Sequence, residues 1–163
     1  MNIILHEPEI PHNTGNIGRT CVATGTALHL IKPLGFSIDE KSVRRAGLDY
    51  WDKLDIYLYD DFEDFLQKNP NAVIYMATTK AKNTYAEVKY EENSFIMFGK
   101  ESAGIPEDIL IKYPDTSIRI PMEPHIRSLN LSNAVAIVLY ESLRQQNFSN
   151  MQLEGQLRNY TWK

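Results

Sequence analysis

The segment S128-L-N-L-S-N-A-V135 sets an unusual number of helix-capping side chains in front of a strongly apolar run. Four of its residues can cap a helix: Ser128, Asn130, Ser132 and Asn133. One capping side chain is enough to satisfy the free N–H groups at a helix start. The surplus therefore indicates a second role for this segment, and the apolar run predicts a helix over 130–146 that is covered on more than one side.

The composition indicates a single globular domain over residues 1–163. The net charge of −4 and the 43% of hydrophobic residues exclude a disordered chain and a generally basic nucleic-acid binder. The start, MNIILHEPEIP, lacks the basic and apolar regions of a signal peptide, and the longest apolar run is far too short to span a membrane. Cys21 is the only cysteine, so we expect a cytoplasmic protein in which this thiol packs in the core and is not a nucleophile.

Short β-branched runs alternate with helical patterns along the chain. Strands are predicted at 2–5, 27–33, 54–59, 72–78, 94–99 and 117–122, and helices at 13–25, 39–46, 60–69, 106–113 and 130–146. This alternation predicts an α/β fold with a mainly parallel sheet flanked by helices. In the polar tail, 148–163, the spacing of Leu153, Leu157 and Trp162 predicts a short docked segment.

Polar loops follow three of the predicted strands. They are HEPEIPHNTGNIGRT (6–20), GKESAGIPED (99–108) and PMEPHIRSLNLSN (121–133), and each combines Gly or Pro with polar or charged residues. Ligands collect outside the carboxyl ends of parallel strands, so these loops are the candidate site.

Several common sites are excluded by spacing. The first loop carries no G-x-G-x-x-G and no phosphate-binding G-x-x-x-x-G-K-[ST], and GKESAG is not a G-x-S-x-G nucleophile elbow. The histidines and carboxylates lack the spacing of zinc ligands, so no metal is expected.

The three loops, in this order, resemble those of the SPOUT superfamily, and within it the TrmH-like branch of RNA ribose 2′-O-methyltransferases. The matching residues are Asn13 and Arg19 in NTGNIGR, Gly99 and Glu101 in FGKESAG, and Ser128 and Asn130 after the apolar strand IRIPM. HEPEIPHNTGNIGRTC, RRAGLDYWD, TTKA and RSLNLSNAVAIVLYE further resemble the small TrmL, or YibK-like, subfamily, and the similarity runs to about residue 146.

The resemblance implies a C-terminal trefoil knot, although general topology rules make knots rare. It implies S-adenosyl-L-methionine (AdoMet) as the methyl donor, and the wobble nucleotide in the tRNA anticodon loop as the acceptor. The donor pocket would be built from Ala77, Thr78, Gly99, Ile120, Met122, Ser128 and Leu129. The catalytic residues would be Arg19, Asn13, Glu101, Ser128 and Asn130.

Each of these residues also has an ordinary structural explanation. Arg19 would grip a phosphate or stabilise a developing 2′-oxyanion, or it is a surface arginine. Asn13 would position catalytic groups, or it only caps the helix over 13–25. Glu101 would orient Arg19 or Asn13, or it is a solvated turn carboxylate. Gly99 would allow close approach of backbone to a ligand, or serve a tight turn that needs a positive φ. His12 and His125 remain alternative proton acceptors.

Two partners are expected. The resemblance implies a homodimer through the helix over 130–146, which would cover the second apolar face; the alternative is a fully internal helix. tRNA phosphates would meet the basic residues Lys41, Arg44, Arg45, Lys80, Lys82 and Arg127, and Tyr50 or Trp51 would stack on a base or belong to the core. Rival functions are 2′-O-methylation of rRNA or of another tRNA position, and a catalytically silent RNA-binding module.

Overall fold

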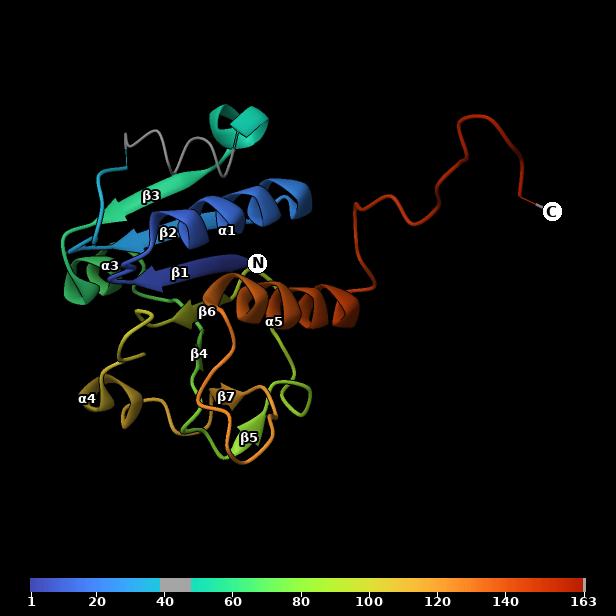
Figure 1. Cartoon of the computed structure of the whole chain (residues 1–163). Coiled ribbons are helices and arrows are strands. Elements are labelled where there is room, and N and C mark those ends of the chain that lie inside the picture. The colour runs from blue at the N-terminus through green and yellow to red at the C-terminus, as the bar shows by residue number, and fades with distance from the viewer. Residues whose placement is uncertain (39–47, 163) are drawn as a thin grey trace.

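A parallel seven-stranded sheet forms the centre of the computed structural model, which describes residues 1–38 and 48–162 (Figure 1). The strand order is β3-β2-β1-β6-β4-β7-β5, and every pairing between neighbours is parallel. The strands are β1 (Asn2–His6), β2 (Ala27–Ile31), β3 (Ile56–Tyr59), β4 (Ile74–Ala77), β5 (Asn83–Thr84), β6 (Phe95–Phe98) and β7 (Ser117–Arg119).

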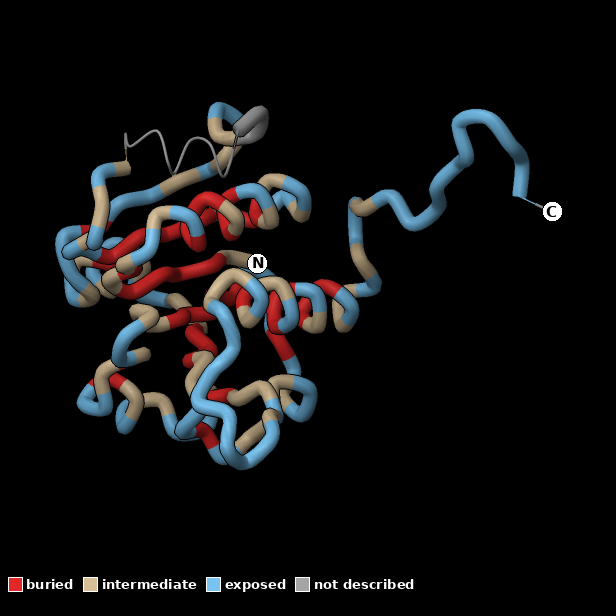
Figure 2. The backbone as a smooth tube through the Cα atoms, viewed as in Figure 1, coloured by how far each residue is buried: buried red, intermediate tan, exposed pale blue. Residues whose placement is uncertain are grey.

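Helices cover both faces of this sheet, which is why its central strands are apolar on consecutive residues. The helices α1 (Pro11–Thr24) and α5 (Leu131–Gln145) lie side by side on one face (Figure 1). Alternate strand residues such as Ile3 and Leu5 pack beneath them. The opposite residues, Ile4 among them, pack with α3 (Phe62–Lys68) and α4 (Glu107–Leu110). Figure 2 shows the resulting band of buried backbone through the sheet.

The predicted α/β architecture is confirmed, with differences in detail. All six predicted strands are present, but the two-residue β5 and the 3₁₀ helix η1 (Leu48–Lys53) were not predicted. The helix predicted over 106–113 forms only as α4, and the one predicted over 39–46 lies outside the described residues, as do Lys41, Arg44 and Arg45. Within the described residues, no helix is long and apolar enough to cross a membrane.

The start of α1 corrects the prediction for Asn13. The helix begins at Pro11, with Ile10 at the N-cap and no capping side chain, so Asn13 does not cap it. Proline suits a first helical position because its missing N–H would have no partner there and its fixed φ is helical. Because the buried Asn13 side chain does not cap the helix, its amide can form hydrogen bonds with other loops.

Cys21 lies on the buried side of α1, as predicted for a core thiol. Its side chain is fully buried, and burial raises the pKa of the thiol to about 12. A thiol with so high a pKa carries almost no thiolate near neutral pH, which makes it unreactive.

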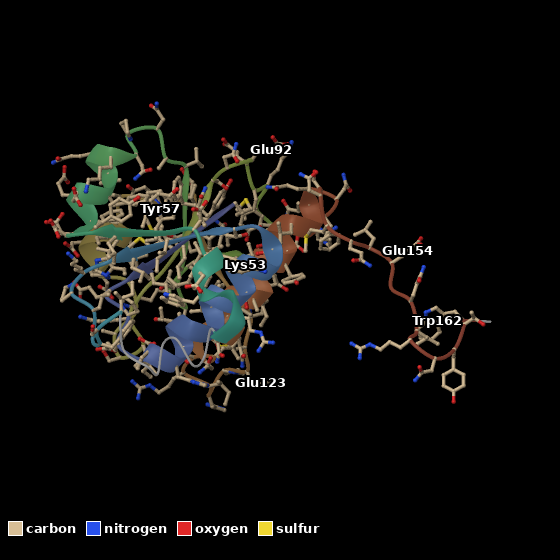
Figure 3. All side chains as sticks on the ribbon, turned by 90° about the horizontal axis from the view of Figure 1, so that it is seen from above. Lys53, Tyr57, Glu92, Glu123, Glu154 and Trp162 are labelled. Atoms are coloured by element: carbon tan, nitrogen blue, oxygen red, sulfur yellow. The ribbon has the colours of Figure 1, made fainter. Side chains whose placement is uncertain are left out.

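Most of the C-terminal tail is not docked on this chain, contrary to the prediction. Phe148 and Met151, just after α5, pack against the core. Beyond them the backbone runs out as an extended segment, and Trp162 lies far from the body of the protein (Figures 1 and 3). Leu153 is 72% exposed and Trp162 is 73% exposed. The apolar spacing of the tail therefore has no partner surface on the same chain within the described residues.

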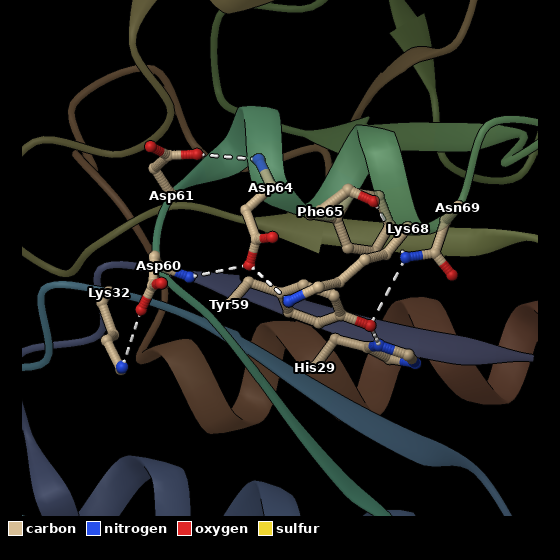
Figure 4. A network of polar contacts seen from close by, with 9 residues as sticks. All are labelled: His29, Lys32, Tyr59, Asp60, Asp61, Asp64, Phe65, Lys68 and Asn69. Carbon is tan, nitrogen blue, oxygen red and sulfur yellow. Dashed lines mark hydrogen bonds and ion pairs between the residues drawn. The ribbon is translucent and has the colours of Figure 1, made fainter.

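A buried histidine on β2 lies inside a cluster of aromatic rings. The His29 ring stacks on Tyr57, with 4.8 Å between centroids, and its Nδ1 lies 2.9 Å from the Tyr59 hydroxyl (Figure 4). Phe65 and Phe95 meet the same ring edge-on. Burial lowers the pKa of His29 to about 4, so this side chain is neutral in the native protein near neutral pH.

His29 is expected to make stability depend on pH. An unfolded histidine titrates near 6.5, whereas the folded one titrates near 4, so the unfolded state binds more protons between these values. The free energy of unfolding should therefore fall as pH decreases from about 6.5 to 4, by on the order of 3 kcal/mol for this residue. Urea unfolding of wild type and His29→Phe across this range measures the effect. Equal pH slopes for the two proteins would contradict it.

Candidate active site

The three candidate loops meet where the strand order changes direction. From β1 the chain continues through β2 to β3 on one side, while β4, β7 and β5 lie beyond β6 on the other. The loops that leave β1 and β6 therefore emerge next to each other at the carboxyl ends of adjacent strands. This is the position at which α/β sheets bind ligands.

Glu101 joins the loop after β6 to the loop after β1. Its carboxylate accepts hydrogen bonds from the backbone N–H of Glu9 at 2.8 Å and of Ile10 at 3.3 Å. It also accepts one from the Asn13 side-chain amide at 2.9 Å. Of the two residues that Glu101 was predicted to orient, Arg19 and Asn13, it therefore holds a hydrogen bond with Asn13.

Asn13 also forms a hydrogen bond with the third loop. Its side-chain oxygen accepts a hydrogen bond of 3.0 Å from the Asn130 amide. Asn130 is the N-cap of α5, and its oxygen accepts from the backbone N–H of Ser132 at 2.9 Å and of Asn133 at 3.4 Å. One chain of hydrogen bonds, Glu101–Asn13–Asn130, therefore connects segments that are 88 and 117 residues apart in sequence.

Two further contacts fasten the first loop to the second. The Glu9 carboxylate accepts from the Ser102 backbone N–H at 2.8 Å and from its hydroxyl at 2.7 Å, and these bonds lower the pKa of Glu9. Lys100 forms an ion pair of 2.8 Å with Glu7, which raises the pKa of the lysine. Sequence reasoning missed these residues, although glutamates at alternate positions of a polar loop were a visible signal.

The residues predicted to bind the methyl donor gather at the carboxyl ends of β4, β6 and β7. Ala77 is in register with Phe98 on one side and with Ile118 on the other, and the Thr78 N–H donates to the Ile118 carbonyl at 2.9 Å. Thr78, Gly99 and Ile120 therefore begin neighbouring loops, and all three are only partly buried.

The third loop completes this group. Met122 is partly buried, whereas Leu129 is 37% exposed and Ser128 is exposed. Of the two polar residues predicted here, Asn130 belongs to the hydrogen-bond network, and Ser128 lies two residues before the cap without sharing that role.

Gly99 is required by the packing of its own loop, and the alternative of a tight turn with a positive φ is wrong. It does not adopt a positive φ; that conformation belongs to Gly104, with φ 73°. A Cβ on residue 99 would lie 2.0 Å from the Gly104 carbonyl carbon and 2.1 Å from the Ile105 nitrogen. Glycine is needed here because the loop folds back on its own backbone, which also shapes the surface beside Ala77.

Arg19 lies on a different face of α1 from the network. It follows Asn13 by six residues, which on an ideal helix is about 120° around the axis and roughly 9 Å along it. Arg19 is exposed, whereas Asn13 is buried. His12 and His125 are exposed as well.

Two of the predicted RNA contacts have packing or ion-pair roles. Trp51 is half-buried, and its ring covers Gly18 of α1, at 3.4 Å from where a Cβ would lie, so its contacts are those of the core alternative. Lys80 forms an ion pair of 2.8 Å with Glu107, whereas Lys82 and Arg127 are exposed.

Two surface hollows are lined by residues outside the three loops. A hollow of about 530 Å³ lies beside β2 and β3, and another of about 360 Å³ lies at the amino ends of β4 and β6. Within residues 1–38 and 48–162, no three His, Cys, Asp or Glu side chains are grouped so that they could hold a metal ion.

Residues 1–140 match the model of the SpoU rRNA Methylase family. The chain belongs to this family. A protein of Listeria monocytogenes serotype 4b (strain F2365), provisionally named tRNA (cytidine(34)-2′-O)-methyltransferase, is 51% identical over 150 residues, which are 90% of this chain and 89% of that protein. The tRNA (cytidine(34)-2′-O)-methyltransferase of Escherichia coli (strain K12) is 46% identical over 91% of this chain and 95% of its own.

The fold of this SpoU-family chain also matches solved structures. One of them, described as giving structural insights into the 2-OH methylation of C/U34 on tRNA, superposes with a TM-score of 0.86 at 40% identity. The match covers 90% of this chain and 95% of that one. The resemblance found in the three loops therefore extends to the whole fold.

The Asn130 network is expected to stabilise this SpoU-family domain measurably. Asn130→Ala removes both the cap of α5 and the bond to Asn13, so the free energy of unfolding should fall by about 1–2 kcal/mol. Asn130→Ser keeps a capping oxygen but is too short to reach Asn13, and should lose less. Urea unfolding at neutral pH measures both.

Asn133→Ala is the matched control for these substitutions. Its side chain is exposed on the same helical turn, and its backbone N–H still donates to Asn130. We expect a change below about 0.5 kcal/mol in this variant. A loss in Asn130→Ala no larger than in the control would show that the network contributes nothing to stability.

Proposed function

We propose that this chain is an AdoMet-dependent methyltransferase that modifies the ribose 2′-hydroxyl of the wobble nucleotide, cytidine or uridine 34, in tRNA. The observation that carries the proposal is the Glu101–Asn13–Asn130 chain of hydrogen bonds, because it brings the three family loops into one site. The names of relatives that match about nine-tenths of the chain support the choice of substrate.

The donor site would lie at the ends of β4, β6 and β7. Ala77, Thr78, Gly99, Ile120, Met122, Ser128 and Leu129 would form it. These residues suit AdoMet, because incompletely covered apolar side chains can sandwich the adenine while nearby backbone groups read its edge. Ile126 and Leu129 have exposed side chains, and the adenine ring of AdoMet would cover them. Bound AdoMet would supply a methyl group already activated by its sulfonium.

The acceptor side would be organised by Arg19 together with Asn13 and Glu101. Arginine stays protonated in proteins, so Arg19 would act as a cation that grips a phosphate and stabilises the forming 2′-oxyanion. Asn13, fixed by Glu101 and Asn130, would hold the first loop in the geometry that aligns the hydroxyl with the methyl group. Ser128 would contact the donor or the nucleotide.

A C-terminal trefoil knot is part of this proposal. The connection that follows β4 is tied to the far end of α5, since the Gln145 amide donates to the Val88 carbonyl at 3.0 Å and the Tyr90 N–H donates to Gln145 at 3.1 Å. This contact supports a path in which the chain of the third loop passes through that connection before it becomes α5.

A homodimer through α5 is also proposed, in the cytoplasm where tRNA is processed. One side of the helix, with Val135, Val138 and Leu139, is buried in the core. The other side leaves Ile137 37% exposed and Tyr140 44% exposed. A second subunit that covers the outer side of α5 would explain why both sides of the helix are apolar. The site loops at the start of α5 would then lie near the boundary between the subunits.

Arg19→Ala tests the assignment of the acceptor side. Labelled AdoMet is incubated with bulk tRNA and the modified nucleotide is mapped; wild type should place the methyl group on the ribose of nucleotide 34. Arg19→Ala should lower kcat by about 100-fold or more while the Kd of AdoMet stays within about twofold, because the guanidinium acts on the acceptor. A parallel loss of AdoMet affinity would contradict the assignment, and a methyl group elsewhere would contradict the substrate.

Sedimentation tests the dimer. Wild type at micromolar concentration should sediment as a dimer, and Ile137→Asp should sediment as a monomer because a charge at the interface would lose its hydration. Ile111→Asp is the matched control, since this isoleucine is 75% exposed beside α4 on the other face of the sheet. A wild-type monomer would contradict the proposal.

A further inference from the structure

We propose that Glu9 is a positioning residue for methyl transfer, which holds Glu101 and through it the Asn13 amide. The inference rests on the proposed function and goes beyond its residues, because Glu9 would not touch donor or acceptor. It is drawn from the way in which the loop after β1 and the loop after β6 interlock.

The two loops interlock through alternate residues. Glu7 pairs with Lys100 at one end of the contact. Next to it, the Glu9 carboxylate accepts from Ser102 while the Glu9 N–H donates to Glu101 at 2.8 Å. Glu9 is therefore bonded at once to the Glu101 carboxylate and to the residue that follows Glu101. This double contact fixes both the backbone and the side chain of Glu101.

Both oxygens of the Glu9 carboxylate are used within the protein. One accepts the Ser102 backbone N–H and the other accepts the Ser102 hydroxyl. A carboxylate bonded to Ser102 through both oxygens is held in one orientation, which suits a positioning role. Its effect on the reaction would pass through Glu101, the residue next to Ser102.

Glu101 in turn determines which way the Asn13 amide faces. The amide nitrogen donates to Glu101 and the amide oxygen accepts from Asn130, so the two ends of the amide have different partners. If Glu101 moves, the amide loses one of the two contacts that hold it, and the Asn130 bond alone leaves its position less restricted. Displacements of about 1 Å in a site that aligns two reactants can cost about 100-fold in rate.

Gly35, in the loop after β2, holds Glu9 from the other side. Its N–H donates to the Pro8 carbonyl at 2.9 Å. A Cβ on residue 35 would lie 2.7 Å from both the Cα and the carbonyl oxygen of Glu9. Glu9 is thus confined between Gly35 and Ser102. Gly35→Ala would push the Glu9 backbone without removing any polar group.

The test compares Glu9→Ala, Glu9→Gln, Gly35→Ala and the control Glu92→Ala in tRNA methyl transfer. Glu9→Ala and Gly35→Ala should lower kcat by about 10- to 100-fold and leave the KM of AdoMet within about twofold. Glu9→Gln should retain most of the activity, because its amide can still accept from the Ser102 N–H and donate to the hydroxyl. Glu92→Ala removes an exposed carboxylate at the amino end of β6 (Figure 3) and should change nothing.

A double-mutant cycle shows whether Glu9 acts through Glu101. Once Glu101→Ala has been introduced, adding Glu9→Ala should cost no further activity, because the residue that Glu9 positions is gone. Multiplicative losses would overturn the proposal, and so would wild-type kcat in Glu9→Ala.

Nuclear magnetic resonance separates this inference from the proposed function. The Asn13 side-chain amide should exchange slowly with solvent in wild type and in Glu92→Ala, and faster in Glu9→Ala and Gly35→Ala. Unchanged exchange in those two variants would overturn the positioning role even if wild type methylates tRNA. If wild type transfers no methyl group to tRNA, the proposed function fails, and the exchange rates still decide whether Glu9 holds the network.

Discussion

The Glu101 carboxylate accepts hydrogen bonds from two backbone N–H groups of the loop after β1 and from the Asn13 amide. Loops that leave adjacent parallel strands are close by topology, but their relative orientation depends on contacts of this kind. Through Asn13, the same carboxylate also sets the start of α5, because Asn130 bonds to Asn13 with one end of its amide and caps the helix with the other. The same hydrogen-bond network therefore holds both the three site loops and the start of α5.

This arrangement answers the question raised by the four potential capping residues around the start of α5. Asn130 is the cap, and its amide still has a nitrogen to offer to Asn13. The Ser132 hydroxyl donates to the Asn130 oxygen at 2.7 Å and so holds the cap in place. The apolar helix that follows buries one side in the core and leaves Ile137 and Tyr140 outward, a pattern that agrees with the proposed second subunit.

Much of the fold could be predicted from sequence because its signals are local. Consecutive apolar residues in β1 and β6 report burial on both faces, and the loops with Gly, Pro and polar residues mark the carboxyl ends of the strands. The partners of those loops could not be predicted without the resemblance. Glu9 and Ser102 are 93 residues apart, and no pattern near either one indicates the other. Of the two alternatives for Asn13, capping is wrong because the helix starts two residues earlier, at Pro11, which is an equally good first helical residue.

A crystal structure with AdoMet bound tests the central claim most directly. The account predicts the adenine and ribose against the ends of β4, β6 and β7, with the methyl group directed toward the surface between Asn13 and Arg19. AdoMet bound in the hollow beside β2 and β3, or a methyl group directed away from the first loop, would contradict it.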